Sequence, residues 1–164
     1  SNLPELEALL GIGHRPGAGL RIGIKHRILL EHIPAGEPGA FESCHEAGDI
    51  DGAIAIYENL YAQNSGSIVV ANNLASLLST YRDDADSLER AWVIARRLRD
   101  IDNPALQDTY GWTLFRRGEV EEALPYLESA AAGLENDPMV QAHLGFAYAA
   151  LERNDAALAQ MQKA

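Results

Sequence analysis

Two short stretches near the start of the chain carry residue types that could do chemistry, and each lacks a part that the chemistry needs. The glycine-rich run Gly11–Gly19 could cradle a phosphate, but it has no Gly-Lys-Ser/Thr ending and follows a segment with a helical pattern. Cys44 beside His45 could pair a nucleophile with a base, yet adjacent helical residues point about 100° apart. We interpret the run as a plain loop and Cys44 as a small core thiol.

The acidic clusters and the histidines do not predict a metal site. Neither 49–52 (DIDG) nor 83–86 (DDAD) has the ligand ladder and closing Glu of a calcium loop. The five histidines show no metal-ligand spacing, and a single cysteine excludes a multi-cysteine zinc site. We therefore expect no catalytic residue, no metal and no cofactor, so we do not expect an enzyme.

Charge and hydropathy exclude further classes of function. The net charge of −11 argues against a nucleic-acid or anionic-membrane partner, since both need a cationic face. Residues 1–33 hold four Lys/Arg against three Glu, whereas the rest holds nine Lys/Arg against twenty-one Asp/Glu. No apolar run approaches the roughly 20 residues of a membrane span, so we expect no membrane insertion. The sequence assigns the chain to no compartment.

A 34-residue period organises the second half of the chain. Gly111 and Gly145 are 34 residues apart, and so are Ala123 and Ala157. Such a period is typical of stacked helical hairpins, in which small residues let neighbouring helices approach closely. Capping residues followed by proline mark two helix starts, at Pro104 and Pro138. The expected helices are Gly39–Ala47, Ile50–Gln63, Ser67–Tyr81, Ser87–Arg99, Pro104–Arg117, Val120–Ala132, Pro138–Leu151 and Asp155–Lys163.

The front segment, residues 1–37, differs from the repeats. Residues 2–10 open like a helix, with Asn2 as cap and Pro4 in the first turn. The glycine-rich loop follows, and residues 20–33 fit either a strand or a helix; we favour a helix. Residues 34–38 are expected to form a boundary loop.

These recurring residues resemble the tetratricopeptide repeat over about residues 38–164. The shared pattern is a large and a small residue in the first helix, a turn glycine, then an alanine in the second helix. The resemblance implies an all-α superhelix, a solenoid of about four hairpins in units 38–66, 67–103, 104–137 and 138–164. Three positions depart from the pattern: Phe41 replaces a small residue, extra residues surround 83–86, and Glu152 replaces the last turn glycine.

The resemblance also implies a groove, lined by the first helix of each hairpin, that binds peptides. The matching positions in this sequence are Asn72, Asn73, Ser76, Asp108, Trp112, Phe115, Arg116 and Phe146. Trp112 and Phe146 occupy equivalent positions and would form a two-ring apolar floor. The amide and hydroxyl side chains would hold a peptide backbone. In the alternative, both rings are buried by neighbouring helices or by a further unit.

One branch of the family grips a C-terminal carboxylate with basic residues, and this chain lacks them. The positions that should be basic are Pro38, Ala105 and Thr109, and Glu42 stands where an asparagine is expected. A carboxylate needs charged donors, so that ligand is excluded.

The sequence therefore predicts a non-catalytic protein–protein interaction scaffold. Its acidic balance favours a protein or peptide partner with basic flanks, and the aromatic pair favours an apolar anchor. Two alternatives stay open. One is a self-associating spacer of a larger assembly, exported or secretion-linked, in which residues 1–33 dock onto the acidic repeats and give a homo-oligomer. The other is the regulatory domain of a larger enzyme.

Overall fold

The computed structural model describes residues 49–164, and this part of the chain is built from helices joined by short turns, without a strand. The helices are α3 (Ile50–Gln63), α4 (Ile68–Tyr81), α5 (Ala85–Ala95), the 3₁₀ turn η2 (Arg96–Leu98), α6 (Pro104–Arg116), α7 (Val120–Gly133), α8 (Pro138–Ala150) and α9 (Asn154–Met161). The front segment 1–37, the helix expected over Gly39–Ala47 and the pair Cys44–His45 lie outside the described residues.

Helix starts follow the capping chemistry that the sequence predicts. Asn103 accepts hydrogen bonds from the backbone N–H groups of Ala105 and Leu106, at 3.0 and 3.4 Å. Asp137 does the same for Met139 and Val140, at 3.0 and 3.3 Å. Each cap satisfies two N–H groups that a helix terminus otherwise leaves unpaired, and a proline with no N–H follows it directly.

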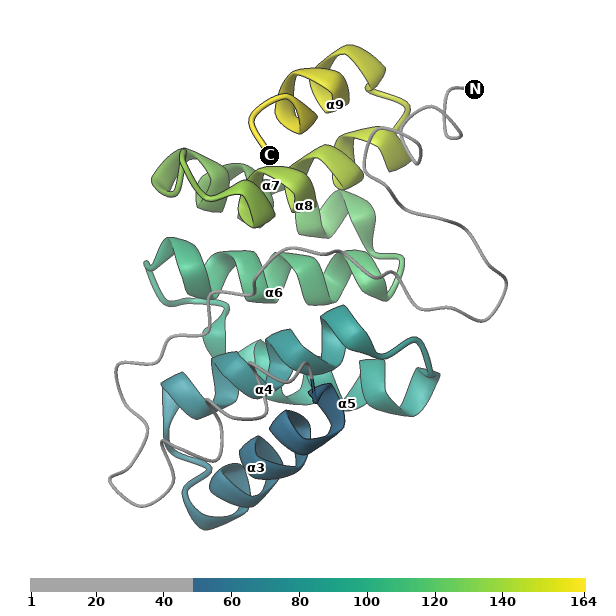
Figure 1. Cartoon of the computed structure of the whole chain (residues 1–164). Coiled ribbons are helices and arrows are strands. Elements are labelled where there is room, and N and C mark those ends of the chain that lie inside the picture. The colour runs from purple at the N-terminus through teal and green to yellow at the C-terminus, as the bar shows by residue number, and fades with distance from the viewer. Residues whose placement is uncertain (1–48) are drawn as a thin grey trace.

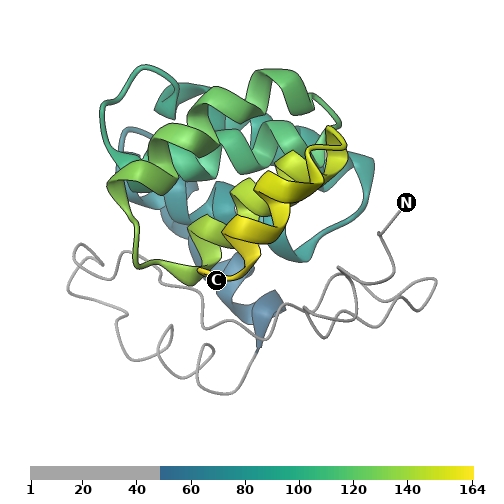
Figure 2. The same cartoon turned by 90° about the horizontal axis from the view of Figure 1, so that it is seen from above.

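The helices stack in chain order as antiparallel hairpins (Figure 1). Helices α4 and α5, α6 and α7, and α8 and α9 form the pairs, and α3 packs against α4. The first helices also contact one another, α4 with α6 and α6 with α8. Seen along the stack, the successive hairpins overlie one another (Figure 2). Each hairpin therefore buries its apolar side against the next one.

Small residues let the two helices of a hairpin approach closely. A Cβ atom added at Gly111 of α6 would lie 2.9 Å from Cγ of Leu127 in α7. At the equivalent Gly145 of α8 it would lie 2.7 Å from Cε of Met161 in α9. Ala123 and Ala157, in the second helices, are fully buried. The predicted packing role of these positions is confirmed.

The turn inside the last hairpin repeats the backbone of the previous one without its glycine. Gly118 has φ of +88°, a left-handed conformation that glycine adopts without strain. Glu152, 34 residues later, has φ of +57°. A side chain in this region costs roughly 1–2 kcal/mol. The predicted departure at this position therefore changes local strain but not the path of the chain.

Most helices end within one or two residues of their predicted bounds, and the largest difference is at α5. We expected a single helix over Ser87–Arg99, but α5 starts at Ala85 and tightens into η2 after Ala95. The early start has a clear cause, because the side chain of Asp84 accepts a 2.8 Å hydrogen bond from the N–H of Ser87 and caps the helix. The tighter 3₁₀ turn places Leu98 in the core, where it is fully buried.

Candidate functional site: a pocket across three first helices

A pocket of about 410 Å³ crosses the first helices of three successive hairpins, α4, α6 and α8. Four of the predicted groove residues line it: Asn72, Asn73, Ser76 and Asp108. The starts of α6 and α8 complete the lining, together with the end of α7. Because each helix belongs to a different hairpin, the pocket exists only through stacking of the units.

On the α4 side, the pocket wall is a chain of polar side chains anchored on α3. Nδ2 of Asn72 donates to Oδ1 of Asn73 at 3.1 Å, and Nδ2 of Asn73 donates to the Tyr57 hydroxyl at 3.0 Å. Burial raises the pKa of Tyr57 above its ordinary value, and the hydrogen bond from Asn73 lowers it in part. The phenol thus stays neutral at pH 7, and the two amides are held in fixed orientations.

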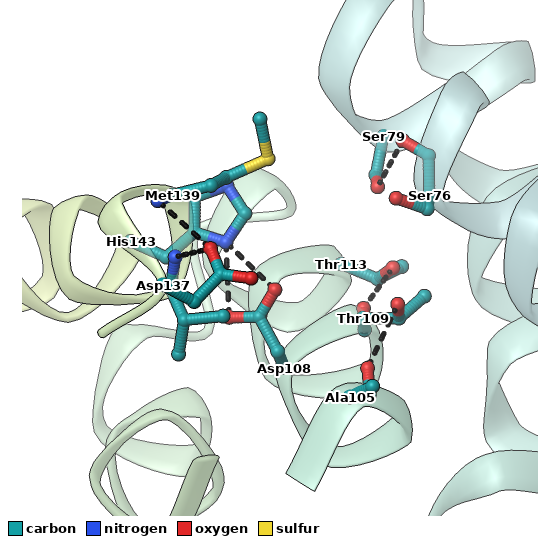
Figure 3. Close-up of polar contacts among 10 residues, drawn as sticks. Ser76, Ser79, Ala105, Asp108, Thr109, Thr113, Asp137, Met139 and His143 are labelled. Carbon is teal, nitrogen blue, oxygen red and sulfur yellow. Dashed lines mark hydrogen bonds and ion pairs between the residues drawn. The ribbon is translucent and has the colours of Figure 1, made fainter. Parts of the chain in front are cut away.

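On the α6 side, Asp108 pairs with His143 of α8. Nδ1 of His143 lies 3.0 Å from both carboxylate oxygens (Figure 3). An ionised carboxylate only accepts hydrogen bonds, so Nδ1 carries the proton. The His143 side chain is 2% exposed and that of Asp108 12%. This pair ties the third hairpin to the fourth and fixes the direction of the carboxylate.

The predicted exposed aromatic floor is wrong for Trp112, whose side chain is only 1% exposed. Its ring stacks on His143 at 4.0 Å and on Phe115 at 4.9 Å between centroids, with interplanar angles of 10° and 11°. The ring of Phe146 lies farther off and tilted, at 6.0 Å and 42°. The imidazole and the phenyl ring of Phe115 both stack on the indole, so Trp112 is a packed core residue outside the pocket lining.

Phe115, Arg116 and Phe146 do not line the pocket. Phe115 and Phe146 are partly buried against the core. Arg116 reaches the end of α4, where it donates to the carbonyl oxygens of Ser79 and Arg82 at 2.5 and 3.1 Å and pairs with Asp83 at 2.5 Å. A cation at a helix C-terminus stabilises it, so the structure gives Arg116 a role in joining two hairpins. Peptide binding by these residues stays a prediction.

Sequence reasoning missed most of the lining and also His143, the partner of Asp108. His143 stands 34 residues after Thr109, so the period alone places it on the same face of its helix. Asn103 and Asp137 were interpreted only as caps, yet both line the pocket. Pairing of His143 with Asp108 depends on the offset between α6 and α8, which the period does not give.

Hydrogen-bond donors at the pocket are mostly engaged within the protein. The first-turn N–H groups of α6 and α8 bond to their caps. The Thr109 hydroxyl donates to the carbonyl oxygen of Ala105 at 3.2 Å, one turn earlier in α6. An acceptor remains, because Oδ1 of Asn72 is buried and has no partner among the described residues.

Residues 49–164 show no group of three or more His, Cys, Asp or Glu that could hold a metal ion. Within the same range, no helix combines the length and apolar character that crossing a membrane requires.

Comparisons with known proteins show the fold. No family model matches the sequence, and no curated protein matches it. Six chains of solved structures are similar. One of them is MamA of AMB-1, a tetratricopeptide-like protein, with a TM-score of 0.51 and 18% sequence identity. The match covers 75% of this chain and 66% of that chain, slightly less than two thirds of MamA. The predicted all-α, tetratricopeptide-like solenoid is thereby confirmed.

Proposed function

We propose that the protein is a non-catalytic interaction module whose pocket across α4, α6 and α8 docks a segment of a partner protein. The observation that carries the proposal is the pocket itself, which crosses three stacked hairpins and so offers a continuous surface to an extended chain. Its lining mixes amides, hydroxyls and carboxylates with the apolar side chains of Leu134, Met139 and Val140. Such a mixture suits a peptide, which has a polar backbone and apolar side chains.

One buried polar atom without a partner belongs to the pocket lining and supports the same proposal. Oδ1 of Asn72, Nε1 of Trp112 and Nε2 of His143 are buried, and none has a hydrogen-bond partner within residues 49–164. Buried polar groups without partners are rare in native proteins, because each one costs about 1–3 kcal/mol. Asn72 lines the pocket, whereas Trp112 and His143 lie on α6 and α8 outside its lining.

The test is selection of binders from a random library of 12-residue peptides against the full chain. The variant Ala105→Trp fills the pocket from the first turn of α6. The matched control is Ala85→Trp, in the exposed first turn of α5 and outside the pocket lining. We expect Ala105→Trp to weaken binding of the selected peptides at least about tenfold and Ala85→Trp to leave it unchanged. A library that yields no binder, or binders indifferent to Ala105→Trp, would reject the proposal.

A further inference from the structure

The pocket lining is negatively charged, and this charge indicates which kind of side chain the pocket binds. The inference rests on the proposed docking function. Among the described residues that line it, the ones carrying charge at neutral pH are Asp108 and Asp137, and neither lysine nor arginine lines it. Oδ1 of Asp137 accepts hydrogen bonds from the two N–H groups at the start of α8. Each carboxylate has more acceptor sites than these contacts use.

A buried acceptor without a partner adds an independent observation. Asn72 is 5% exposed and lines the pocket on the wall opposite α8. Its Nδ2 is used by Asn73, which leaves Oδ1 as the unsatisfied end of the polar chain from Tyr57. Such an oxygen calls for a hydrogen-bond donor.

The arrangement disfavours an anionic occupant. Helix N-termini attract anions through free N–H groups, but at α6 and α8 the side chains of Asn103 and Asp137 already occupy those groups. Two carboxylates in the lining would also repel a negative ligand. The pocket therefore presents acceptors and negative charge where a phosphate or carboxylate site needs donors.

The arginine of α6 does not neutralise the negative charge of the pocket. Arg116 is held by the end of α4 and by Asp83, with its side chain 13% exposed. Asp108 pairs with His143, which approaches from the α8 side. Nδ1 of that histidine sits between the two carboxylate oxygens and orients them as a pair.

We propose that the pocket receives one lysine or arginine side chain of the docked partner segment. The cationic head lies between the Asp108 carboxylate and Oδ1 of Asn72, with the Asp137 carboxylate adding to the negative field. The apolar stem of that side chain packs along Met139 and Val140, as long basic side chains commonly do on apolar surfaces. His143 is a positioning residue, because it holds Asp108 in the direction that the cation requires. Charge complementarity thus identifies a basic segment as the occupant.

The experiment compares peptides that differ only in this side chain. Peptides selected on the full chain are resynthesised with each Lys or Arg replaced in turn by norleucine, which keeps the stem and removes the charge. We expect one position at which the replacement weakens binding about tenfold or more. Binding of the parent peptide should also weaken as salt concentration rises.

Protein variants assign that effect to the pocket. Asp108→Asn should remove the preference for the charged peptide. Asp137→Asn provides a second variant that keeps the fold, since asparagine caps a helix as well as aspartate does. Its matched control is Asp84→Asn, the same change at the exposed cap of α5. We expect Asp137→Asn to weaken binding and Asp84→Asn to leave it unchanged.

The outcomes separate the two proposals. Selected peptides that are blocked by Ala105→Trp but carry no basic residue, or lose nothing on replacement by norleucine, would overturn the cation site and leave the docking function standing. Binding that is lost equally in Asp137→Asn and Asp84→Asn would also overturn it. A library without binders would reject both.

Discussion

Two faces of helix α6 meet different kinds of surface. The hairpin face, Tyr110 and Gly111, packs against α7. The rings of Tyr110 and Tyr126 meet edge-on with 4.7 Å between centroids, and the backbone at Gly111 lies close to the side chain of Leu127. The inner face, Asp108 and Trp112, meets α8 through a histidine and borders the pocket. One face is apolar and closely packed, whereas the other holds a charge and an indole N–H without a partner in the described structure.

The difference teaches what each face contributes. The hairpin face is complete within the chain, because its apolar area is covered by α7, and it supports the fold. The inner face carries buried polar groups whose partners the described residues do not supply. Such groups lower stability unless something else binds to them. The proposed docking function concerns the part of this face that lines the pocket, which is Asp108.

The largest expected effect is on the hairpin face. Leu127→Ala should lower the free energy of unfolding by about 2–5 kcal/mol, because it empties a fully buried site opposite Gly111. Urea unfolding followed by circular dichroism measures this. Leu158→Ala is the control: its side chain is 41% exposed, and it should change stability by no more than about 0.5 kcal/mol. Equal losses in the two variants would contradict the packing described.

The two equivalent glycines provide a finer test of the hairpin face. Gly111→Ala should destabilise the protein by about 1–3 kcal/mol, since its Cβ meets the branched carbon of Leu127 and Cβ of Tyr126. Gly145→Ala should cost less, because the neighbour is the flexible tip of Met161 and alanine favours the helix by about 1 kcal/mol. Thermal unfolding of both variants measures the two losses of stability. A larger loss in Gly145→Ala than in Gly111→Ala would show that the hairpins pack differently.

The inner face should show a smaller, coupled effect. Asp108→Asn removes a charge-assisted hydrogen bond and should lower stability by about 1–3 kcal/mol. His143→Gln removes the other partner. In a double-mutant cycle the two changes should be non-additive by at least about 0.5 kcal/mol, because each one breaks the same pair. Strictly additive losses would mean that the pair does not form in solution.

The smallest effect concerns alkaline pH and the hairpin face. Burial raises the pKa of Tyr110 above its ordinary value of 10.0. In the unfolded chain the phenol ionises near pH 10, while in the folded chain it stays neutral to higher pH, so stability is full below pH 10 and falls as pH rises above it. Tyr110→Phe should make this fall shallower in unfolding curves measured between pH 9 and 11. An unchanged dependence of stability on pH would mean that the Tyr110 hydroxyl is exposed to solvent in the folded protein.

Much of the fold was predictable from the sequence, because it depends on local signals. Asn103-Pro104 and Asp137-Pro138 mark helix starts through capping chemistry, and the spacing of Gly111 and Gly145 shows which sides of the helices meet. The early start of α5 was missed because Asp84 looked like part of a loop, although its side chain caps the helix.

The candidate site was predictable only in part. The period gives the face on which Asn72, Asn73, Ser76 and Asp108 lie, and the structure places all four at one pocket. The period does not give the offset between α6 and α8. That offset stacks the imidazole of His143 on the indole of Trp112. Contacts between residues about 35 positions apart depend on how hairpins stack, which no single repeat encodes.

The most direct test of the inner face as the docking surface uses the two tryptophans as reporters. Trp112 stacks on the histidine that holds Asp108, whereas Trp92 lies on α5 beside Arg117, outside the pocket lining. In ¹⁵N–¹H NMR spectra, a selected lysine-containing peptide should shift the indole N–H signal of Trp112 and leave that of Trp92 in place. A shift of the Trp92 signal alone, or of neither signal at saturating peptide, would contradict the account.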